Sequence, residues 1–423
     1  MGSVLAVILS IFISIIVVLV LITLHELGHF IVAKLSKTYV FEFAIGFGPK
    51  LFVIKTKETW YSVRLIPLGG YVSIASDFAE PPKGREKEFE AIPDSRKIDY
   101  AIKWKKTLFI LFGPLINLFV AYILIFSVLF GVGYKPTDPN FYGQNFSTSS
   151  VAYQMIAKNE GKTPDPQLNK YIANDLQVAI TGWDVTIGEK IFYLFTTSNK
   201  SDIAPTYKEI STMFNQGKSK ILKYIKEIEP KDEDKILYKF SYVKLENDYS
   251  GKIIGKEITT VSAEIKNSKE VIRLWKEANQ ITGIAIAPPD RHFKNGGAKF
   301  GYTFVETWNQ AFSLVVGIGK FFTGDFSAIS GPVGIAKSST SGGAPTTSLK
   351  ASRMFYISSI SANLFMLNIL PFPPLDGYKF WETLVEWVTR KEVSQKTKTI
   401  IYATGAILLI GFIIVVTVKD III

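Results

Sequence analysis

The chain of 423 residues is 48% hydrophobic and contains 48 Lys and Arg against 37 Asp and Glu, a formal net charge of +11. This length allows two or three domains, and no basic run with interleaved aromatics forms a nucleic-acid module, so we exclude nucleic acid and attribute the charge to Lys-rich loops beside a lipid bilayer. The sequence has no cysteine, which excludes disulfides, thiol nucleophiles and Cys-ligated zinc.

Residues 4–24 are 21 consecutive uncharged and mostly apolar residues. A helix of that length spans the ~30 Å hydrocarbon core of a bilayer. A cleaved signal peptide is the alternative, but the run is long for a signal core and no small-x-small cleavage pattern follows it. We therefore expect a retained first transmembrane helix that continues through His29 to about Lys34.

A His-Glu-x-x-His signature (HExxH) ends this run, with His25, Glu26 and His29 as its defining residues. Residues four apart share one helix face, so both imidazoles can bind one metal, and Glu26 is placed to take a proton from metal-bound water. The alternative is two histidines that only hydrogen-bond and pack, which the cost of ionisable groups in a membrane disfavours. The third histidine, His292, is expected to be a surface residue.

Residues 36–106 are more polar, and residues 39–72 alternate apolar and polar side chains as strands do. Gly and Pro at positions 46–49 and 67–70 indicate turns. A β-hairpin near the metal could hold an extended substrate along its edge, although a small β structure on the membrane surface fits the same pattern. Residues 77–106 predict a loop and a surface helix.

Residues 107–132 form a second uncharged run of 26 residues. The pair Gly113-Pro114 within it loosens a spanning helix and lets neighbouring helices approach. Asn117 is a polar side chain at membrane depth. It either links two helices by a hydrogen bond or faces a reaction site.

The chain is polar from Tyr134 to about Phe300, and this composition predicts an inserted α+β domain. Residues 177–180, 236–243 and 282–287 look like strands, and residues 218–228 like a helix. Residues 307–319 are uncharged but short for a span, which favours an interfacial or buried amphipathic helix. A Ser/Thr/Gly-rich connector follows at residues 338–348.

A third apolar run covers residues 354–370, and Pro371, Pro373 and Pro374 follow it. These prolines force the backbone out of helical geometry, which is tolerated at membrane depth where it lines a cavity. Asp376 is thus expected on a bent, non-helical segment near the membrane edge, with a helix N-cap as its alternative role. Residues 399–418 are a fourth uncharged run of 20 residues.

Lys and Arg near the four predicted spans are unevenly distributed. One side has Lys34, Lys37, Lys103, Lys105, Lys106, Arg390, Lys391, Lys396 and Lys398, and the other has Lys135, Lys350, Arg353 and Lys419. The positive-inside rule places the richer side in the cytoplasm. The active site therefore lies towards the cytoplasmic face, with residues 133–353 extracytoplasmic.

A catalytic zinc needs three protein ligands and an open position for water. His25 and His29 supply two, and Asp376 is the acidic residue on a bent element on the same predicted side. Glu26 would act as general base and pass the proton to the leaving amine. Asn368 or Asn117 could bind the substrate backbone or donate to the developing oxyanion.

The sequence resembles the site-2 protease family of zinc metalloproteases, the bacterial regulator-of-sigma type of intramembrane protease. Matching segments occur in the family's order at residues 25–29, 42–49 with 66–71, 113–117, and 368–377, the last reading Asn-x-x-Pro-x-Pro-x-Leu-Asp-Gly. Residues 330–336 also resemble a segment that these proteins carry. Together these segments cover roughly the first 133 and last 100 residues.

The resemblance implies that His25, His29 and Asp376 bind zinc (Zn2+), that Glu26 is the base, and that Asn368 contacts substrate backbone. It implies single-span membrane proteins or signal-peptide remnants as substrates, cleaved within the bilayer after an earlier cut, and a membrane-associated hairpin lining their path. Residues 151–155, 180–183 and 282–285 vaguely echo the family's PDZ domains with stretched spacing. They indicate a divergent PDZ-like or family-specific domain.

The predicted fold is a membrane α-helical protein with four transmembrane helices, a membrane-associated β-hairpin and an inserted α+β, divergent PDZ-like extracytoplasmic domain. Its segments are residues 1–35, 36–106, 107–132, 133–302, 303–353, 354–398 and 399–423. Two alternatives to an active protease are a catalytically inactive membrane receptor or regulator with a retained metal site, and a transporter. Three candidate ligands fit an open site better than a closed structural one, and four spans without an inverted repeat disfavour a transporter.

Overall fold

A computed structural model describes residues 2–77, 79–135, 145–147, 150–163, 171–172, 176, 178–196, 204–228, 235–245, 253–254, 257–265, 268–278, 286–287, 291–293, 295–324, 329, 349–391 and 393–422. The chain divides into a helical unit, Met1–Ser127 with Gly297–Gly342 and Arg353–Ile423, and a mixed unit, Val128–Gly296 with Gly343–Ser352. Residues 282–285, 330–336 and 338–348, which the sequence singles out, lie outside the described residues.

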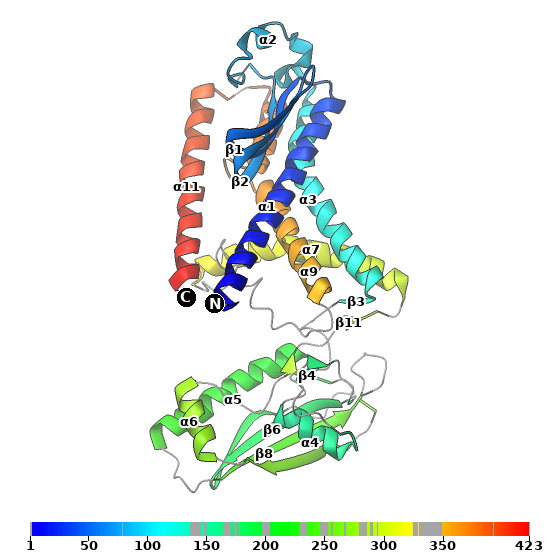
Figure 1. The fold of residues 1–423 in the computed structure, drawn as a ribbon, viewed down its shortest axis with the longest axis vertical. Coiled ribbons are helices and arrows are strands. Elements are labelled where there is room, and N and C mark those ends of the chain that lie inside the picture. Colours follow the sequence, from blue (N-terminus) through cyan, green and yellow to red (C-terminus); the bar gives the residue numbers. More distant parts are fainter. Residues whose placement is uncertain are drawn as a thin grey trace. The chain divides into compact units, whose positions relative to one another are not determined.

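Long helices make up most of the helical unit (Figure 1). They are α1 (Gly2–Leu35), α3 (Lys103–Gly131), α7 (Gly296–Phe322), α9 (Leu349–Ile369), α10 (Asp376–Thr389) and α11 (Gln395–Ile422). Three candidate membrane spans lie in the described part of the chain, at Phe12–Leu35, Lys103–Gly131 and Gln395–Asp420. The protein is therefore a membrane protein by its helices.

Helix α9, which carries the third predicted span, is not among these candidates. Its 21 residues include several serines and two asparagines, and Ser358 and Ser361 are fully buried. Ser358 donates to the side chain of Gln310 in α7, and Ser361 to the backbone oxygen of Asn117 in α3, both at 2.7–2.8 Å. The polar side chains of α9 thus face other helices and find hydrogen-bond partners there, so its low mean hydropathy is compatible with a position among apolar helices. That α9 crosses the bilayer stays a prediction.

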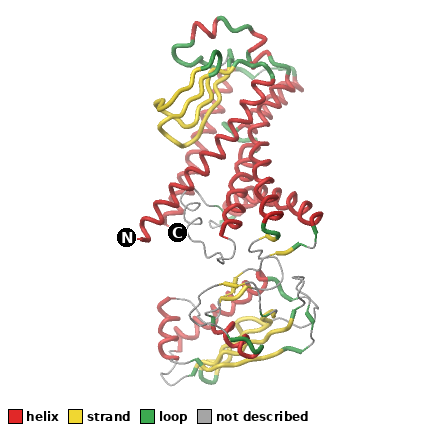
Figure 2. Tube along the Cα trace, turned by 45° about the vertical axis from the view of Figure 1, so that its right-hand side comes forward, coloured by secondary structure: helices red, strands yellow, loops and turns green. Residues whose placement is uncertain are grey.

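Strands β1 (Val40–Lys55) and β2 (Trp60–Ile74) pair antiparallel, with several register shifts. In Figures 1 and 2 they lie beside α1. The first half of β1 is buried, whereas Leu51, Phe52 and Ile54 in its second half are 53–64% exposed. Exposed apolar clusters of this kind mark a contact surface, so the second half of β1 has a surface suited to lipid.

The charged segment after the hairpin caps its base. It contains α2 (Glu86–Glu90), η1 (Asp94–Arg96) and η2 (Ile98–Tyr100). The Arg85 guanidinium is buried and donates to the backbone oxygens of Phe41 and Glu58 at 2.6 and 2.8 Å. These bonds join the start of β1 and the β1–β2 turn to the loop that follows the hairpin.

The mixed unit contains one larger antiparallel sheet, in the order β7-β6-β8-β9, and small pairings elsewhere. The bounds are β3 (Tyr134–Lys135), β4 (Asn145–Ser147), β5 (Tyr171–Ile172), β6 (Val178–Ile187), β7 (Lys190–Thr196), β8 (Ile236–Lys244), β9 (Thr259–Glu264), β10 (Ile286–Ala287), β11 (Arg291–His292), α4 (Val151–Asn159), α5 (Tyr207–Ile228) and α6 (Ser268–Ala278). His292 thus lies in a short strand, paired with Tyr134.

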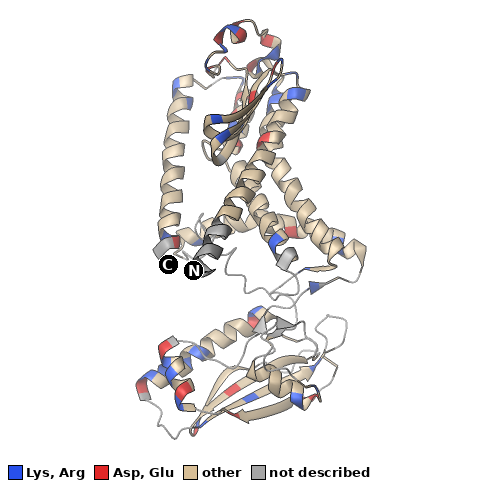
Figure 3. Ribbon diagram, viewed as in Figure 1, with Lys and Arg blue, Asp and Glu red and all other residues tan. Residues whose placement is uncertain are grey.

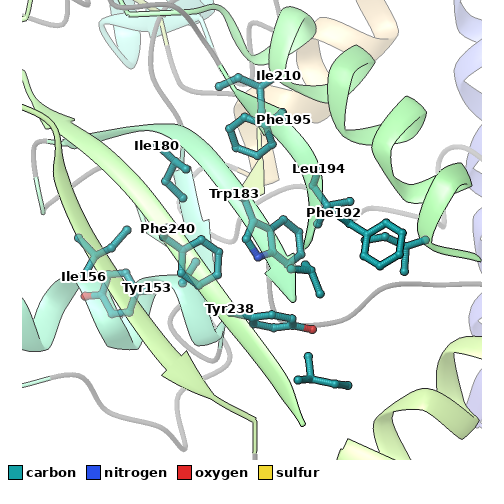
Figure 4. Close-up of a cluster of buried hydrophobic side chains, with 14 of the residues drawn as sticks. Tyr153, Ile156, Ile180, Trp183, Phe192, Leu194, Phe195, Ile210, Tyr238 and Phe240 are labelled. Carbon is teal, nitrogen blue, oxygen red and sulfur yellow. The ribbon is translucent and has the colours of Figure 1, made fainter. Parts of the chain in front are cut away.

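The core of this unit surrounds Trp183 on β6, which is fully buried (Figure 4). Its ring stacks on Phe214 of α5 and Phe240 of β8 with centroids 5.4 Å apart, and meets Tyr238 edge-on at 5.3 Å. Alternating burial along β8 explains why its pattern predicts a strand. The following hairpin strand β7 was not predicted, because its apolar run has no alternation of apolar and polar side chains.

Candidate metal centre

Two buried histidines of α1 present the same ring atom to a common point. His25 and His29 are each 6% exposed, and their Nε2 atoms lie 3.1 Å apart. The rings meet edge-on, with centroids 4.8 Å apart. The four-residue spacing on one helical face produces this convergence, as the sequence predicts.

Asp376 completes the group. Its Oδ2 atom lies 3.0 Å from His25 Nε2 and 3.1 Å from His29 Nε2, although 347 positions separate it from His29. The prediction of a non-helical position was wrong, because Asp376 is the first residue of α10 and Leu375 is the N-cap. The last proline of this segment is Pro374, so helical geometry resumes at Asp376 and the first residue of α10 carries the carboxylate. Lys379, one turn later, contacts the other oxygen, Oδ1, at 3.1 Å.

The three donor atoms fit a zinc ion. A tetrahedral zinc with bonds of about 2.0–2.1 Å holds its ligand atoms about 3.3 Å apart, close to the separations of 3.0–3.1 Å seen here. No fourth His, Cys, Asp or Glu joins the group among the residues that the structure describes. Three donors of this chemistry suit an open, catalytic type of site.

The second nitrogen of each ring has a partner in α3. His29 Nδ1 donates to the backbone oxygen of Phe109 at 2.7 Å, so in the neutral ring the proton is on Nδ1 and Nε2 can bind a metal. Asn117 is 1% exposed, and its side-chain nitrogen lies 3.5 Å from His25 Nδ1. Its side-chain oxygen is buried without a hydrogen-bond partner. The structure therefore brings Asn117 to the outer side of a candidate ligand.

Asn368 is not brought to the group by any hydrogen bond in the described residues. It lies in the last turn of α9, and its side chain donates to the backbone oxygen of Leu364 at 3.0 Å. This bond is local to the helix. The substrate-binding role predicted for Asn368 stays a prediction.

Glu26 lies between the histidines in sequence and beneath β2 in the structure. It is half-buried, and a Cβ built on Gly70 of β2 would lie 3.4 Å from Glu26 Cγ. The same Cβ would lie 2.8 Å from the backbone oxygen of Ala44 in β1. A glycine at position 70 thus lets the hairpin close over the carboxylate.

Glycines also let α1 and α3 approach closely. A Cβ on Gly28 would lie 2.5 Å from the backbone oxygen of Phe112, and a Cβ on Gly113 only 2.2 Å from His29 Nε2. Small residues at helix crossings permit such approach in membranes. The Gly-Pro pair in the second apolar run indicated the crossing, whereas the dependence of His29 on Gly113 appears only in three dimensions.

Gly113→Ala is expected to displace the His29 ring and lower zinc affinity by about 10- to 100-fold, the range seen when supports of metal ligands are lost. The added methyl would occupy the position of the ring. The matched control is Gly131→Ala on the same helix, where a Cβ meets nothing within 4 Å. Zinc titration of both purified variants tests this, and equal affinity would refute the dependence.

The turn before Asp376 is held from two sides. A Cβ on Gly377 would lie 2.3 Å from the backbone oxygen of Ile369, so the chain folds tightly back on the end of α9. A Cβ on Gly405, in the middle of α11, would lie 2.2 Å from the backbone oxygen of Pro373. Sequence reasoning missed Gly405, since one glycine in an apolar helix has no distinguishing pattern.

Gly405→Ala is expected to push α11 off the Pro373 turn and lower both zinc content and thermal stability, by about 1–3 kcal/mol for an overpacked site. Gly411→Ala on the same helix meets nothing within 4 Å and should leave both unchanged. Zinc per protein and melting temperature are the measurements. A variant at position 405 that behaves like the one at 411 would show that this contact does not position α10.

Comparisons with known proteins cover nearly the whole chain. Residues 13–412 match the profile of Peptidase family M50. A protein of Staphylococcus aureus (strain COL) is 31% identical over 429 residues, covering 95% of each chain, and one of Clostridium acetobutylicum is 29% identical over 405 residues, covering 95% and 94%. A Nostoc protein is 26% identical over 422 residues, covering 97% and 96%. All three are named "Putative zinc metalloprotease".

Proposed function

The chain belongs to peptidase family M50, the site-2 protease family of zinc metalloproteases, and from this premise we propose that it cleaves transmembrane segments inside the bilayer. The proposed substrates are single-span membrane proteins or signal-peptide remnants. One observation carries the proposal. Two of the three converging donor atoms belong to a helix with the length and composition to cross a bilayer, which supports cleavage at membrane depth.

We propose His25, His29 and Asp376 as the zinc ligands and Glu26 as the base. A bound zinc ion would supply Lewis-acid polarisation of the scissile carbonyl and favour ionisation of water. The Glu26 carboxylate accepts the proton of the attacking water and then donates it to the leaving amine. The hairpin over Glu26 limits bulk water around this carboxylate, because β2 approaches it at Gly70.

Asn117 and the Phe109 carbonyl orient the two imidazoles. A histidine that binds metal through Nε2 carries its proton on Nδ1, so each Nδ1 needs an acceptor. The Phe109 oxygen is such an acceptor for His29. For His25 we propose that the unpartnered Asn117 oxygen takes this role, since it belongs to the amide that already lies beside Nδ1. Asn368 remains the candidate for contact with substrate backbone.

The hairpin is the proposed guide for substrate. Residues 70–74 of β2 pair with residues 40–45 of β1 along one edge, and an extended peptide can add to a strand at its other edge. The exposed apolar side chains in the second half of β1, including Leu51 and Phe52, suit the bilayer. A substrate helix that unwinds beside β2 would reach Glu26 as an extended chain.

The orientation is proposed from charge. The Lys and Arg distribution favours a cytoplasmic position for the end of α1 and for α10, and an extracytoplasmic position for residues 133–353. In this arrangement the mixed unit, which we propose to be a divergent PDZ-like domain, acts as a filter. It would admit substrates whose ectodomains an earlier protease has removed.

The test is to map the cleavage site. The zinc-loaded protein in liposomes should cut a single-span reporter within its apolar segment, with both product ends identified by mass spectrometry. Cuts confined to the soluble flanks would contradict intramembrane cleavage while leaving a metalloprotease. No cleavage of several unrelated reporters would favour the inactive receptor.

A further inference from the structure

A cavity of about 480 Å³ lies where α1 ends and α3 begins, apart from the metal group. Its walls come from the end of α1, the β1–β2 turn, η1 and the first turn of α3. Four of its lining side chains are cationic, namely Lys34, Lys37, Arg96 and Lys105, and only Glu58 is acidic. Three hydroxyl side chains complete the lining. Figure 3 shows basic residues at this end of α1.

The acidic residue of the cavity is already paired. Glu58 contacts Lys34 Nζ at 2.6 Å and Arg96 at 2.7 Å through its two oxygens. Burial alone would raise the pKa of Glu58, but the hydrogen bonds from Arg96 and Lys34 hold it below its usual range. Lys37 and Lys105 contact no carboxylate among the described residues. The cavity thus has two positively charged side chains, Lys37 and Lys105, that no carboxylate among the described residues neutralises.

The backbone at Lys37 points to a retained role for its side chain. Lys37 has φ of 62°, in the left-handed region where helices usually end with glycine. Its N–H donates to the Lys34 carbonyl at 3.0 Å, and the next N–H, of Thr38, donates to Ala33 at 2.9 Å. Glycine would make this turn without strain, and strain of this kind is typical of functional positions.

The first turn of α3 adds positive charge beside the cavity. It contains Lys103, Lys105 and Lys106 and no acidic residue of its own, although the Glu386 carboxylate of α10 attracts Lys106. The N-terminus of a helix also has a partial positive charge, so an anion in the cavity would be stabilised by Lys105 and by this end of α3. Two lysines without carboxylate partners and three hydroxyl side chains together suit a tetrahedral oxyanion.

Exposed apolar side chains occur at the same ends of α1 and α3. Leu35, Ile102 and Trp104 are 78%, 63% and 55% exposed and lie next in sequence to cavity residues or to the start of α3. Candidate spans end at Leu35 and begin at Lys103, which places the cavity at the level of a bilayer surface. Tryptophan is enriched at that level.

We propose that this cavity binds a phosphate-bearing anion, with Lys37 and Lys105 as its main contacts. The phosphate could belong to the headgroup of an anionic phospholipid, whose acyl chains would meet exposed apolar residues such as Leu35 and Trp104, or to free phosphate. The proposal is independent of the protease activity. It assigns to these lysines a binding role in addition to their effect on membrane orientation.

The test uses the full-length protein in uncharged detergent, titrated with dihexanoyl phosphatidylglycerol, dihexanoyl phosphatidylcholine or inorganic phosphate. The pocket variant is Lys37→Gln with Lys105→Gln, and the control is Lys83→Gln with Lys87→Gln, two exposed lysines of the same loop region. Calorimetry should show phosphatidylglycerol binding the native and control proteins, and binding about 30-fold weaker in the pocket variant, as expected for two lost charges.

Inorganic phosphate that binds as tightly as phosphatidylglycerol, with the same dependence on Lys37 and Lys105, would support the site and identify free phosphate as its source. Equal binding of phosphatidylcholine, or equal affinities in pocket and control variants, would overturn the proposal. Lys37→Gly separates binding from folding. It should keep or raise the melting temperature while weakening binding, and unchanged affinity would remove Lys37 from the site.

Discussion

Glu26→Gln is expected to lower cleavage of a transmembrane reporter by about 10²- to 10⁴-fold, the usual contribution of a general base. The substitution keeps the size of the side chain and removes the group that accepts a proton. His25, His29 and Asp376 are untouched, so zinc content should remain one per chain. The measurements are single-turnover cleavage in liposomes and zinc by mass spectrometry of the same sample.

The matched control for Glu26 is Glu90→Gln, at an exposed position of α2. It makes the same chemical change far along the chain and should cleave as the native protein does. Native-like cleavage by the Glu26 variant would remove Glu26 from the mechanism. Loss of zinc along with activity would show instead that Glu26 supports the metal group.

Asp376→Ala is expected to lower zinc affinity by at least about 100-fold, since losing a direct ligand should exceed the cost of losing an outer partner. The carboxylate oxygen is within 3.1 Å of both histidine nitrogens and is mostly buried. Asp376→Glu keeps a carboxylate and should retain zinc. Competition with a coloured chelator measures each affinity.

Lys379→Gln provides a graded comparison. Lys379 contacts the other oxygen of Asp376 and is about half exposed, so its loss should change zinc affinity by less than about ten-fold. Unchanged zinc content in Asp376→Ala would exclude this residue as a ligand. The convergence of three donor atoms would then be a hydrogen-bonded cluster rather than a metal centre.

Local sequence patterns account for much of the helical unit. Helices α1, α3 and α11 follow from uncharged runs long enough to cross a bilayer, and the hairpin from alternation between glycine turns. Hydropathy does not identify α9 as a span, because its serines lower the mean hydropathy although they are buried against α3 and α7 in the structure. A hydropathy scale assigns a value to each residue type and takes no account of the hydrogen-bond partner that a polar side chain finds in a neighbouring helix.

In the candidate site, too, local sequence predicts some features and only helix packing determines the others. The spacing of His25 and His29 places two imidazoles on one face because helical geometry depends only on neighbouring residues. Other features of the site depend on which helices cross and how near they come. These are the position of Asp376 beside the histidines, the contact of Asn117 with the Nδ1 atom of His25, and the close approaches at Gly113 and Gly405. Those distances result from packing among segments hundreds of residues apart, where a single methyl group decides whether two backbones can meet.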